Sequence, residues 1–287
     1  MVEIGKTNAL EVVKKVDFGV YLDGDEFGEI LLPLRYVPAE CNIGEFLNVF
    51  IYTDSEDRVI ATTETPLAQV GDFAYLQVKD TSSVGAFLDW GLMKDLLVPF
   101  SEQKADLNIG NKVFVYVYLD EKTKRIVASA KWEKFIEKDI VDLSEGTEVS
   151  LKIAAKTELG YKAVIDGKFM GLLYKDEVFR SIQIGDTVTG FIKHIRPDAK
   201  IDLSLTIGGY GKIKNETERI LEKLRESGGF LPTTDKSPAE FIYQTYGISK
   251  KTYKQAIGDL YKRCCVLLEQ DGVRLNTTKQ KNIKNNL

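Results

Sequence analysis

The sequence predicts a mostly β chain, with three small β-barrels in tandem followed by a domain of α+β class. The first observation is a strand pattern that recurs over 16–62, 78–129 and 156–205. Each copy alternates short runs of Val, Ile, Phe and Tyr with Gly, Asp and Asn, which is typical of short antiparallel strands. After Leu205 the apolar period changes from two residues to the spacing of a helix. A copied unit of roughly 70 residues predicts serial modules rather than one large sheet.

Each repeat is expected to close into a small barrel. In 46–52 and 113–118 apolar residues occupy both faces of the strand, which favours a closed or strongly curled sheet. Gly19, Gly85 and Gly160 fall at one place in each copy, in the middle of a strand, where a bulge or a tight bend is expected. A small barrel with a bent second strand has the OB-fold architecture.

We therefore expect four domains, spanning 1–65, 66–140, 141–208 and 209–287, and their charge is uneven. Residues 1–65 carry 5 Lys/Arg against 13 Asp/Glu, whereas residues 209–287 carry 15 against 9. A polyanion should be attracted most strongly to the C-terminal end. Small domains also differ by several charges by chance, so this alternative stays open.

Composition argues against most enzyme classes. His194 is the only histidine, and Cys41, Cys264 and Cys265 lack metal-ligand spacing, so no metal site is expected. The sequence shows no phosphate-cradling glycine loop and no carboxylate pair set against a nucleophile, so we expect a non-enzymatic protein with no catalytic residues and no cofactor. It shows no apolar run long enough for a membrane span and no signal peptide, and the odd cysteine count favours a reducing, cytoplasmic location.

The first repeat resembles the S1 RNA-binding domain. The stretch 17–22 (DFGVYL) is followed by a glycine-led third strand and then by Asp54 and Arg58. The resemblance implies an RNA-binding face made by two aromatics on the second strand, a histidine on the third, and the later Asp and Arg. Matched by position, repeat one supplies Phe18, Tyr21, Asp54 and Arg58 and has Leu31 at the histidine position.

The other two repeats match this face less completely. Repeat two keeps Phe87 but has Val84 and Leu97 at the other places, and repeat three has Leu159 and Lys162, with Tyr174 at the histidine position. All three faces are incomplete, so sequence-specific binding through one of them is not expected.

Exposed rings and cations on these strands are the candidate contacts with nucleic acid. An aromatic ring on an exposed strand stacks a base with about 1–3 kcal/mol, whatever the base. The alternative is that the rings fill the barrel cores, as most aromatics do. The candidate rings are Phe18, Tyr21, Phe87, Trp90, Tyr161 and Tyr174; the candidate cations of repeat three are Lys162, Lys193 and Arg196.

Three helices and a hairpin are expected beyond residue 211, which predicts a winged helix-turn-helix. The first helix should begin at Asn215 with a capping box and end at 228–229, and the second should be capped by Ser237. Ser249 should cap a third helix that runs to about Lys262, and the hairpin 266–275 turns at Asp-Gly. The short glycine-rich stretch 208–211 is expected to be an interdomain linker.

The third helix is the usual nucleic-acid-reading element of such a domain. It carries Lys250, Lys251, Lys254 and Lys262, which contact phosphates rather than bases. Gln255 is the only side chain inside the helix of a type that reads base edges well. The alternative is a solvated lysine-rich face of a protein-interaction module.

Taken as a whole, the chain resembles the conserved virulence factor B family of bacterial proteins. The most specific stretches are 184–187, 195–205, 235–238 and 249–262. The resemblance implies a cytoplasmic RNA-binding protein that regulates gene expression after transcription, in the setting of virulence.

We therefore expect single-stranded RNA as the partner, held across the barrels and the winged helix, with the acidic first barrel contributing least. Two alternatives stay open: a DNA-binding transcription regulator acting through the winged helix, and a ribosome- or polymerase-associated scaffold that docks a protein on the first barrel.

Overall fold

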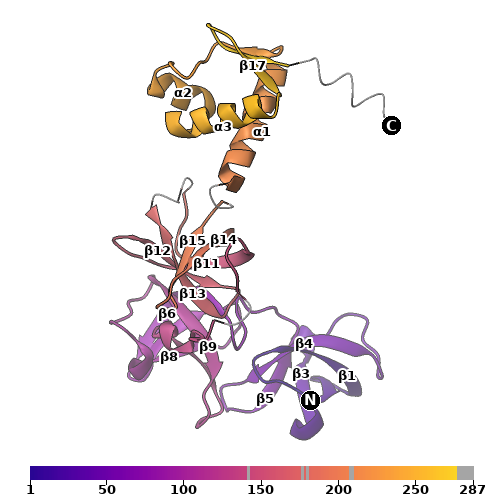
Figure 1. Ribbon diagram of the computed structural model, residues 1–287. Coiled ribbons are helices and arrows are strands. Elements are labelled where there is room, and N and C mark those ends of the chain that lie inside the picture. The colour runs from indigo at the N-terminus through magenta and orange to yellow at the C-terminus, as the bar shows by residue number, and fades with distance from the viewer. Residues whose placement is uncertain (141–142, 176–177, 179–180, 207–209, 277–287) are drawn as a thin grey trace. The chain divides into compact units, whose positions relative to one another are not determined.

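A computed structural model describes residues 1–140, 143–175, 178, 181–206 and 210–276. The chain separates into two compact units, Met1–Leu203 and Ser204–Leu287. The first unit consists mainly of strands, with four short 3-10 helices among its described residues, and the second combines α-helices with a small sheet (Figure 1).

Three closed five-stranded barrels make up the first unit and confirm the predicted architecture. In the first barrel the strands follow the order β1-β2-β3-β5-β4, and the other two repeat this order. The first barrel consists of β1 (Thr7–Val16), β2 (Gly19–Asp23), β3 (Glu29–Pro33), β4 (Phe46–Thr53) and β5 (Val59–Thr62). The second consists of β6 (Phe73–Ser82), β7 (Gly85–Asp89), β8 (Leu96–Pro99), β9 (Lys112–Leu119) and β10 (Ile126–Ser129). The third consists of β11 (Glu148–Lys156), β12 (Gly160–Ile165), β13 (Phe169–Tyr174), β14 (Thr187–Ile195) and β15 (Ile201–Ser204).

The three equivalent glycines open the second strand of each barrel instead of lying in its middle. Gly19, Gly85 and Gly160 have φ values of 156°, 151° and 158°. A Cβ at Gly160 would lie 2.1 Å from the carbonyl oxygen of Leu173, so only glycine fits there. The predicted bulge is present, but it lies in the preceding strand, where the register with the second strand shifts in all three barrels. The glycine and the bulge together bend this hairpin around the barrel.

The barrels of the first unit are packed against one another through apolar side chains. Phe50 and Tyr52 belong to β4, yet they lie in the same buried cluster as the core of the second barrel. A second cluster joins Phe73, Phe114 and Trp132 of the second barrel to Val164 of the third. The serial modules therefore share apolar surface at their junctions, which sequence periodicity does not predict.

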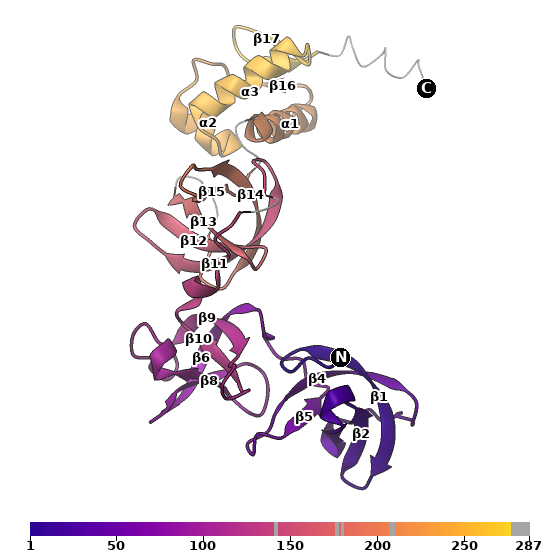
Figure 2. The same ribbon diagram turned by 60° about the horizontal axis from the view of Figure 1, so that its bottom comes forward.

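The second unit has the predicted winged-helix elements and one additional strand (Figure 2). Helices α1 (Tyr210–Glu226), α2 (Ala239–Tyr246) and α3 (Lys250–Lys262) surround a core that includes Leu224, Ile242 and Leu260. The hairpin β17 (Val266–Leu268) and β18 (Val273–Leu275) is confirmed. A two-residue strand, β16 (Phe230–Leu231), extends it into a sheet of order β16-β18-β17.

Two helix starts differ from their predictions. Helix α1 begins at Tyr210, so Asn215 lies inside the helix and 210–211 are not a linker; 207–209 lie outside the described residues. Ser237 does not cap α2, because its hydroxyl accepts the amide of Thr234 and Pro238 occupies the cap position. The third start is confirmed: Ser249 Oγ accepts the amide of Thr252 at 3.1 Å.

Candidate nucleic-acid interface

The hydrogen-bond register identifies equivalent positions on the outer surfaces of the three barrels. Tyr21 pairs with Leu31, Phe87 with Leu97, and Lys162 with Leu172, and these positions repeat between the second and third strands. The predicted alignment of Tyr174 with Leu31 is therefore wrong by two residues. Tyr174 pairs with Gly160 and corresponds to Pro33, which pairs with Gly19.

A large apolar side chain is exposed at the end of the first hairpin in each barrel. Phe18, Val84 and Leu159 are 57%, 55% and 62% exposed and precede the equivalent glycines. In the first barrel Phe18 meets Tyr21 edge-to-face, with ring centroids 6.3 Å apart. The ammonium of Lys14 lies 5.5 Å from the centroid of Tyr21. This end of the first barrel thus joins two rings to a cation, although the barrel as a whole is acidic.

Arg58 is held by carboxylates beside this surface. Its Nε donates to Asp54 Oδ2 at 2.9 Å, and a terminal nitrogen lies 3.0 Å from Glu56. Burial raises the pKa of Asp54, but hydrogen bonds from Arg58 and from the Glu56 amide, together with the charge of Arg58, hold that pKa below its usual value. Arg58 therefore presents its guanidinium plane with its charge already compensated.

In the second barrel the equivalent arginine binds the first barrel instead of facing a ligand. The turn is closed by the same hydrogen bond but is one residue longer: the Asp120 amide donates to the Arg125 carbonyl as the Asp54 amide donates to the Arg58 carbonyl. Arg125 Nε donates to Asp57 Oδ1 at 2.9 Å, and this hydrogen bond holds the pKa of Asp57 below its usual value. Sequence reasoning missed Arg125, because nothing in the sequence shows that two barrels meet here.

Lys94 makes a second link across the same junction. Its ammonium donates to the Asp54 carbonyl at 2.6 Å and lies 3.8 Å from the Asp57 carboxylate. Burial lowers the pKa of Lys94, and Asp57 partly opposes that effect. Part of the negative charge of residues 1–65 is therefore paired with the second barrel.

In the third barrel the first residue of this turn is a cation instead of an aspartate. The Arg196 amide donates to the Lys200 carbonyl at 2.9 Å, so these residues stand where the first barrel has Asp54 and Arg58. Arg196 Nε donates to Asp202 Oδ2 at 3.0 Å, and a terminal nitrogen donates to the Tyr174 hydroxyl at 2.5 Å. Both ends of this turn are thus cations in the third barrel, whereas the other two barrels have an aspartate at the first end and an arginine at the second; Lys200 also pairs with Asp198 of the turn at 2.7 Å.

Other candidates of the third barrel lie around this turn. Lys193 and His194 are exposed near the end of β14, and His194 Nδ1 lies 2.5 Å from Glu145 Oε1. Lys162 is 3.7 Å from Glu133 of the second barrel. Tyr161 has the register position of Val20, which points into its barrel, so it is half-buried and less suited to stacking.

Trp90 is the one candidate ring that the structure excludes from stacking on a base. It is 2% exposed, packs edge-on against Phe50 with centroids 5.6 Å apart, and donates its indole N–H to the Lys94 carbonyl at 2.6 Å. A ring buried between two barrels cannot stack a base, and the core alternative is correct for this residue.

Helix α3 divides into a buried face and an exposed stripe. Tyr253 is 1% exposed and donates its hydroxyl to the Thr233 carbonyl at 3.1 Å, which makes it a core residue. Lys250 is half-buried and reaches the Lys236 carbonyl at 3.4 Å. The exposed stripe is made of Lys251, Lys254, Gln255, Tyr261 and Lys262, with Gly258 in its centre. A glycine inside a helix costs about 1 kcal/mol relative to alanine.

The hairpin β17–β18 presents little positive charge. Its one cation, Arg274, lies over the Phe230 ring at 4.7 Å and donates to Glu269 at 2.6 Å. Leu267 and Leu268 are 44% and 53% exposed on β17. Of these two elements, α3 rather than the hairpin therefore carries the cations that suit phosphate.

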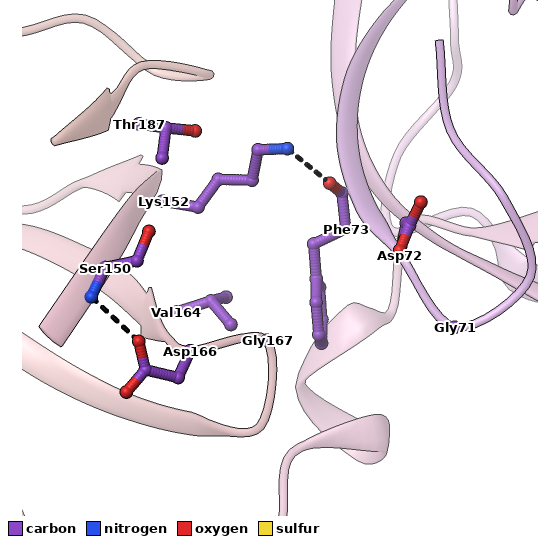
Figure 3. A pocket seen from close by; sticks show the side chains of 9 residues that line it. All are labelled: Gly71, Asp72, Phe73, Ser150, Lys152, Val164, Asp166, Gly167 and Thr187. Atoms are coloured by element: carbon purple, nitrogen blue, oxygen red, sulfur yellow. Dashed lines mark hydrogen bonds between the residues drawn. The ribbon is translucent and has the colours of Figure 1, made fainter. Parts of the chain in front are cut away.

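A cleft of about 340 Å³ lies between the second and third barrels (Figure 3). Its central cation, Lys152, donates to the Phe73 carbonyl at 2.8 Å, and Asp166 accepts the Ser150 amide at 2.8 Å. Lys152 and Asp166 are therefore engaged in hydrogen bonds within the chain, and that of Lys152 links the third barrel to the second. Among the described residues no group of three or more His, Cys, Asp or Glu is placed to hold a metal, and no helix is long and apolar enough to cross a membrane.

Two known domain families match the chain. The S1 domain matches residues 4–64 and 70–131, and the CvfB-like winged helix domain matches residues 218–275. Together with the three closed barrels, these matches define a nucleic-acid-binding protein built from S1-type barrels and a winged helix.

Similarity along the whole chain narrows this class to one family. The chain is 24% identical over 285 residues to conserved virulence factor B of Staphylococcus saprophyticus, covering 95% of this chain and 94% of the relative. It is 26% identical over 267 residues to the uncharacterized protein YitL of Bacillus subtilis, covering 90% and 89%. The chain belongs to the conserved virulence factor B family. A crystal structure of a multidomain protein with nucleic acid binding domains from Streptococcus pneumoniae TIGR4 aligns over 95% of this chain and 98% of that chain, with 21% identity and a TM-score of 0.40.

Proposed function

We propose that this protein binds single-stranded RNA without catalysing a reaction and regulates gene expression after transcription. The observation that carries the proposal is the repetition of one outer surface on three barrels. It presents the exposed Phe18 and the half-buried Tyr21 on the first barrel, the half-buried Phe87 on the second, and the half-buried Tyr174 beside Arg196 on the third. Rings on a strand surface stack unpaired bases, and cations beside them contact the backbone.

Unpaired RNA suits this surface better than a duplex. Stacking on Phe18 or Tyr21 needs a base whose face is open, and single-stranded regions of RNA supply such bases. In α3 the exposed lysines contact phosphates of any sequence, and Gln255 alone is suited to read a base edge. Several weak contacts on one chain gain affinity through a high effective concentration.

The barrels should contribute unequally. Residues 1–65 carry 13 Asp/Glu and 5 Lys/Arg, which opposes the approach of phosphate, so we expect the first barrel to contribute least to bulk affinity. Its rings would add stacking rather than charge. The third barrel and α3 should carry most of the salt-dependent affinity, through Arg196, Lys193 and the exposed lysines.

The first barrel is best tested by point substitution. Phe50 and Tyr52 lie in the core cluster of the second barrel, so deleting residues 1–65 would also open that core. The variants Phe18→Ala and Tyr21→Ala leave the junction intact. We expect either change to weaken binding of an unstructured RNA by less than tenfold, and a larger loss would make the first barrel a principal site.

Competition distinguishes RNA from DNA as the partner. Labelled oligouridine bound to the protein is displaced with unlabelled single-stranded RNA, single-stranded DNA and duplex DNA at equal ionic strength. We expect single-stranded RNA to compete best. If duplex DNA competes best, and in a sequence-dependent way, the winged helix reads DNA and the RNA proposal fails.

A further inference from the structure

Gly258 is half-buried and lies among the exposed side chains of the stripe of α3. Lys254 and Gln255 precede it by four and three residues, and Tyr261 and Lys262 follow it by three and four, so these side chains surround it on the helix surface. The buried face of α3 is formed by Tyr253, Ala256, Ile257 and Leu260. Gly258 therefore belongs to the face that a partner would meet.

No contact within the described chain requires glycine at this position. A Cβ built at Gly258 meets no heavy atom within 4 Å, and Gly258 lacks the positive φ that Gly247 uses to end α2. In contrast, a Cβ at Gly19 would lie 2.2 Å from the Leu32 carbonyl oxygen. After proline, glycine destabilises a helix interior most, so its position here has a cost to the fold without a benefit to it.

We infer that Gly258 is a point of close approach, where a nucleic-acid strand packs against the bare backbone of α3. The inference rests on the proposed function and adds a site to it. We call this position without a side chain the notch; Lys254 and Lys262 lie one turn to either side of it, where they would contact phosphates. The Tyr261 ring, 53% exposed, stands beside the notch and can stack on a sugar or base.

Charge at the notch favours a polyanion over a protein partner. Three lysines lie along the stripe, and the nearby Asp259 carboxylate is 3.3 Å from Arg263 one turn later. Asp235 lies 3.7 Å from the Lys254 ammonium and compensates part of one charge only. The stripe has no exposed aliphatic side chain, which a protein interface would be expected to place at its centre.

The variant Gly258→Ala should change stability and RNA binding in opposite directions. It should raise the thermal midpoint by a few degrees, because alanine favours the helix. It should also weaken binding of oligouridine by about fivefold or more, since one added methyl holds the strand away from the helix. Gly258→Leu should weaken binding further. The matched control is Gln244→Ala on the exposed face of α2, which should change binding by less than about twofold.

The outcomes separate this inference from the proposed function. If the unaltered protein binds RNA and Gly258→Ala binds equally well, the notch is not a contact point and the inference fails alone. If the unaltered protein binds no nucleic acid, the proposed function fails first. If Gly258→Ala lowers the thermal midpoint, the glycine has a structural role and the inference is overturned.

Discussion

The third barrel has Arg196 where the first barrel has Asp54, and this difference can be tested by exchanging the residues. The double variant Arg196→Asp with Asp202→Ile gives the third barrel the residues that the first barrel has at two equivalent positions, Asp54 and Ile60. An aspartate is accommodated in this turn, because Asp54 Oδ1 accepts two amides of its own turn at 2.9 and 3.0 Å. We expect the thermal midpoint to change by less than about 3 °C.

The same variant should weaken RNA binding measurably. It removes the cation beside Tyr174, and one lost phosphate contact reduces the salt slope of single-strand binding by about 0.7 and the affinity by roughly three- to tenfold at low salt. The assay is anisotropy of labelled oligouridine across a salt series. Lys168→Gln, in the turn between β12 and β13, changes the net charge by the same amount and is the control. An unchanged slope in the double variant, or an equal loss in the control, would refute the role of Arg196.

Three further changes test the fold. Gly160→Ala should lower the free energy of unfolding in urea by more than about 2 kcal/mol, because the new Cβ meets the Leu173 carbonyl oxygen; a neutral effect would contradict the backbone geometry. Tyr253→Phe should cost about 1–2 kcal/mol through its buried hydroxyl, whereas Tyr261→Phe on the exposed stripe should cost nothing measurable. Asp57 has a lowered pKa in the folded chain, so its contribution to stability is present above about pH 4 and is lost as the pH falls through the lowered pKa. The Asp57→Asn variant should show a smaller loss of stability over that acid range, and an identical pH profile would show that the ion pair does not matter.

The sequence predicted the barrels because each carries its own strand pattern, and it predicted the third helix because Ser249 is a strong cap. It misplaced Tyr174 for a physical reason: side chains alternate with a period of two, so a slip of two residues keeps the same face outward. Only the hydrogen bonds between β12 and β13 show that Leu172 is the equivalent of Leu31.

Contacts between modules are the other feature of the fold that could not be predicted from the sequence. Trp90 was expected to be a candidate ring and Arg125 was not singled out, yet both are used where the first two barrels meet. A single repeat contains no information about its neighbour, so this use could not be predicted. β16 was missed because two residues are too few to show a period.

Single-strand RNA binding is the central claim, and its salt dependence tests it most directly. The full chain is titrated with oligouridine, oligoadenosine, single-stranded DNA and duplex DNA at two salt concentrations. We expect RNA to bind more tightly than duplex DNA, with little preference among RNA sequences and a steep loss of affinity at the higher salt. The absence of binding to any nucleic acid at low salt would contradict the account.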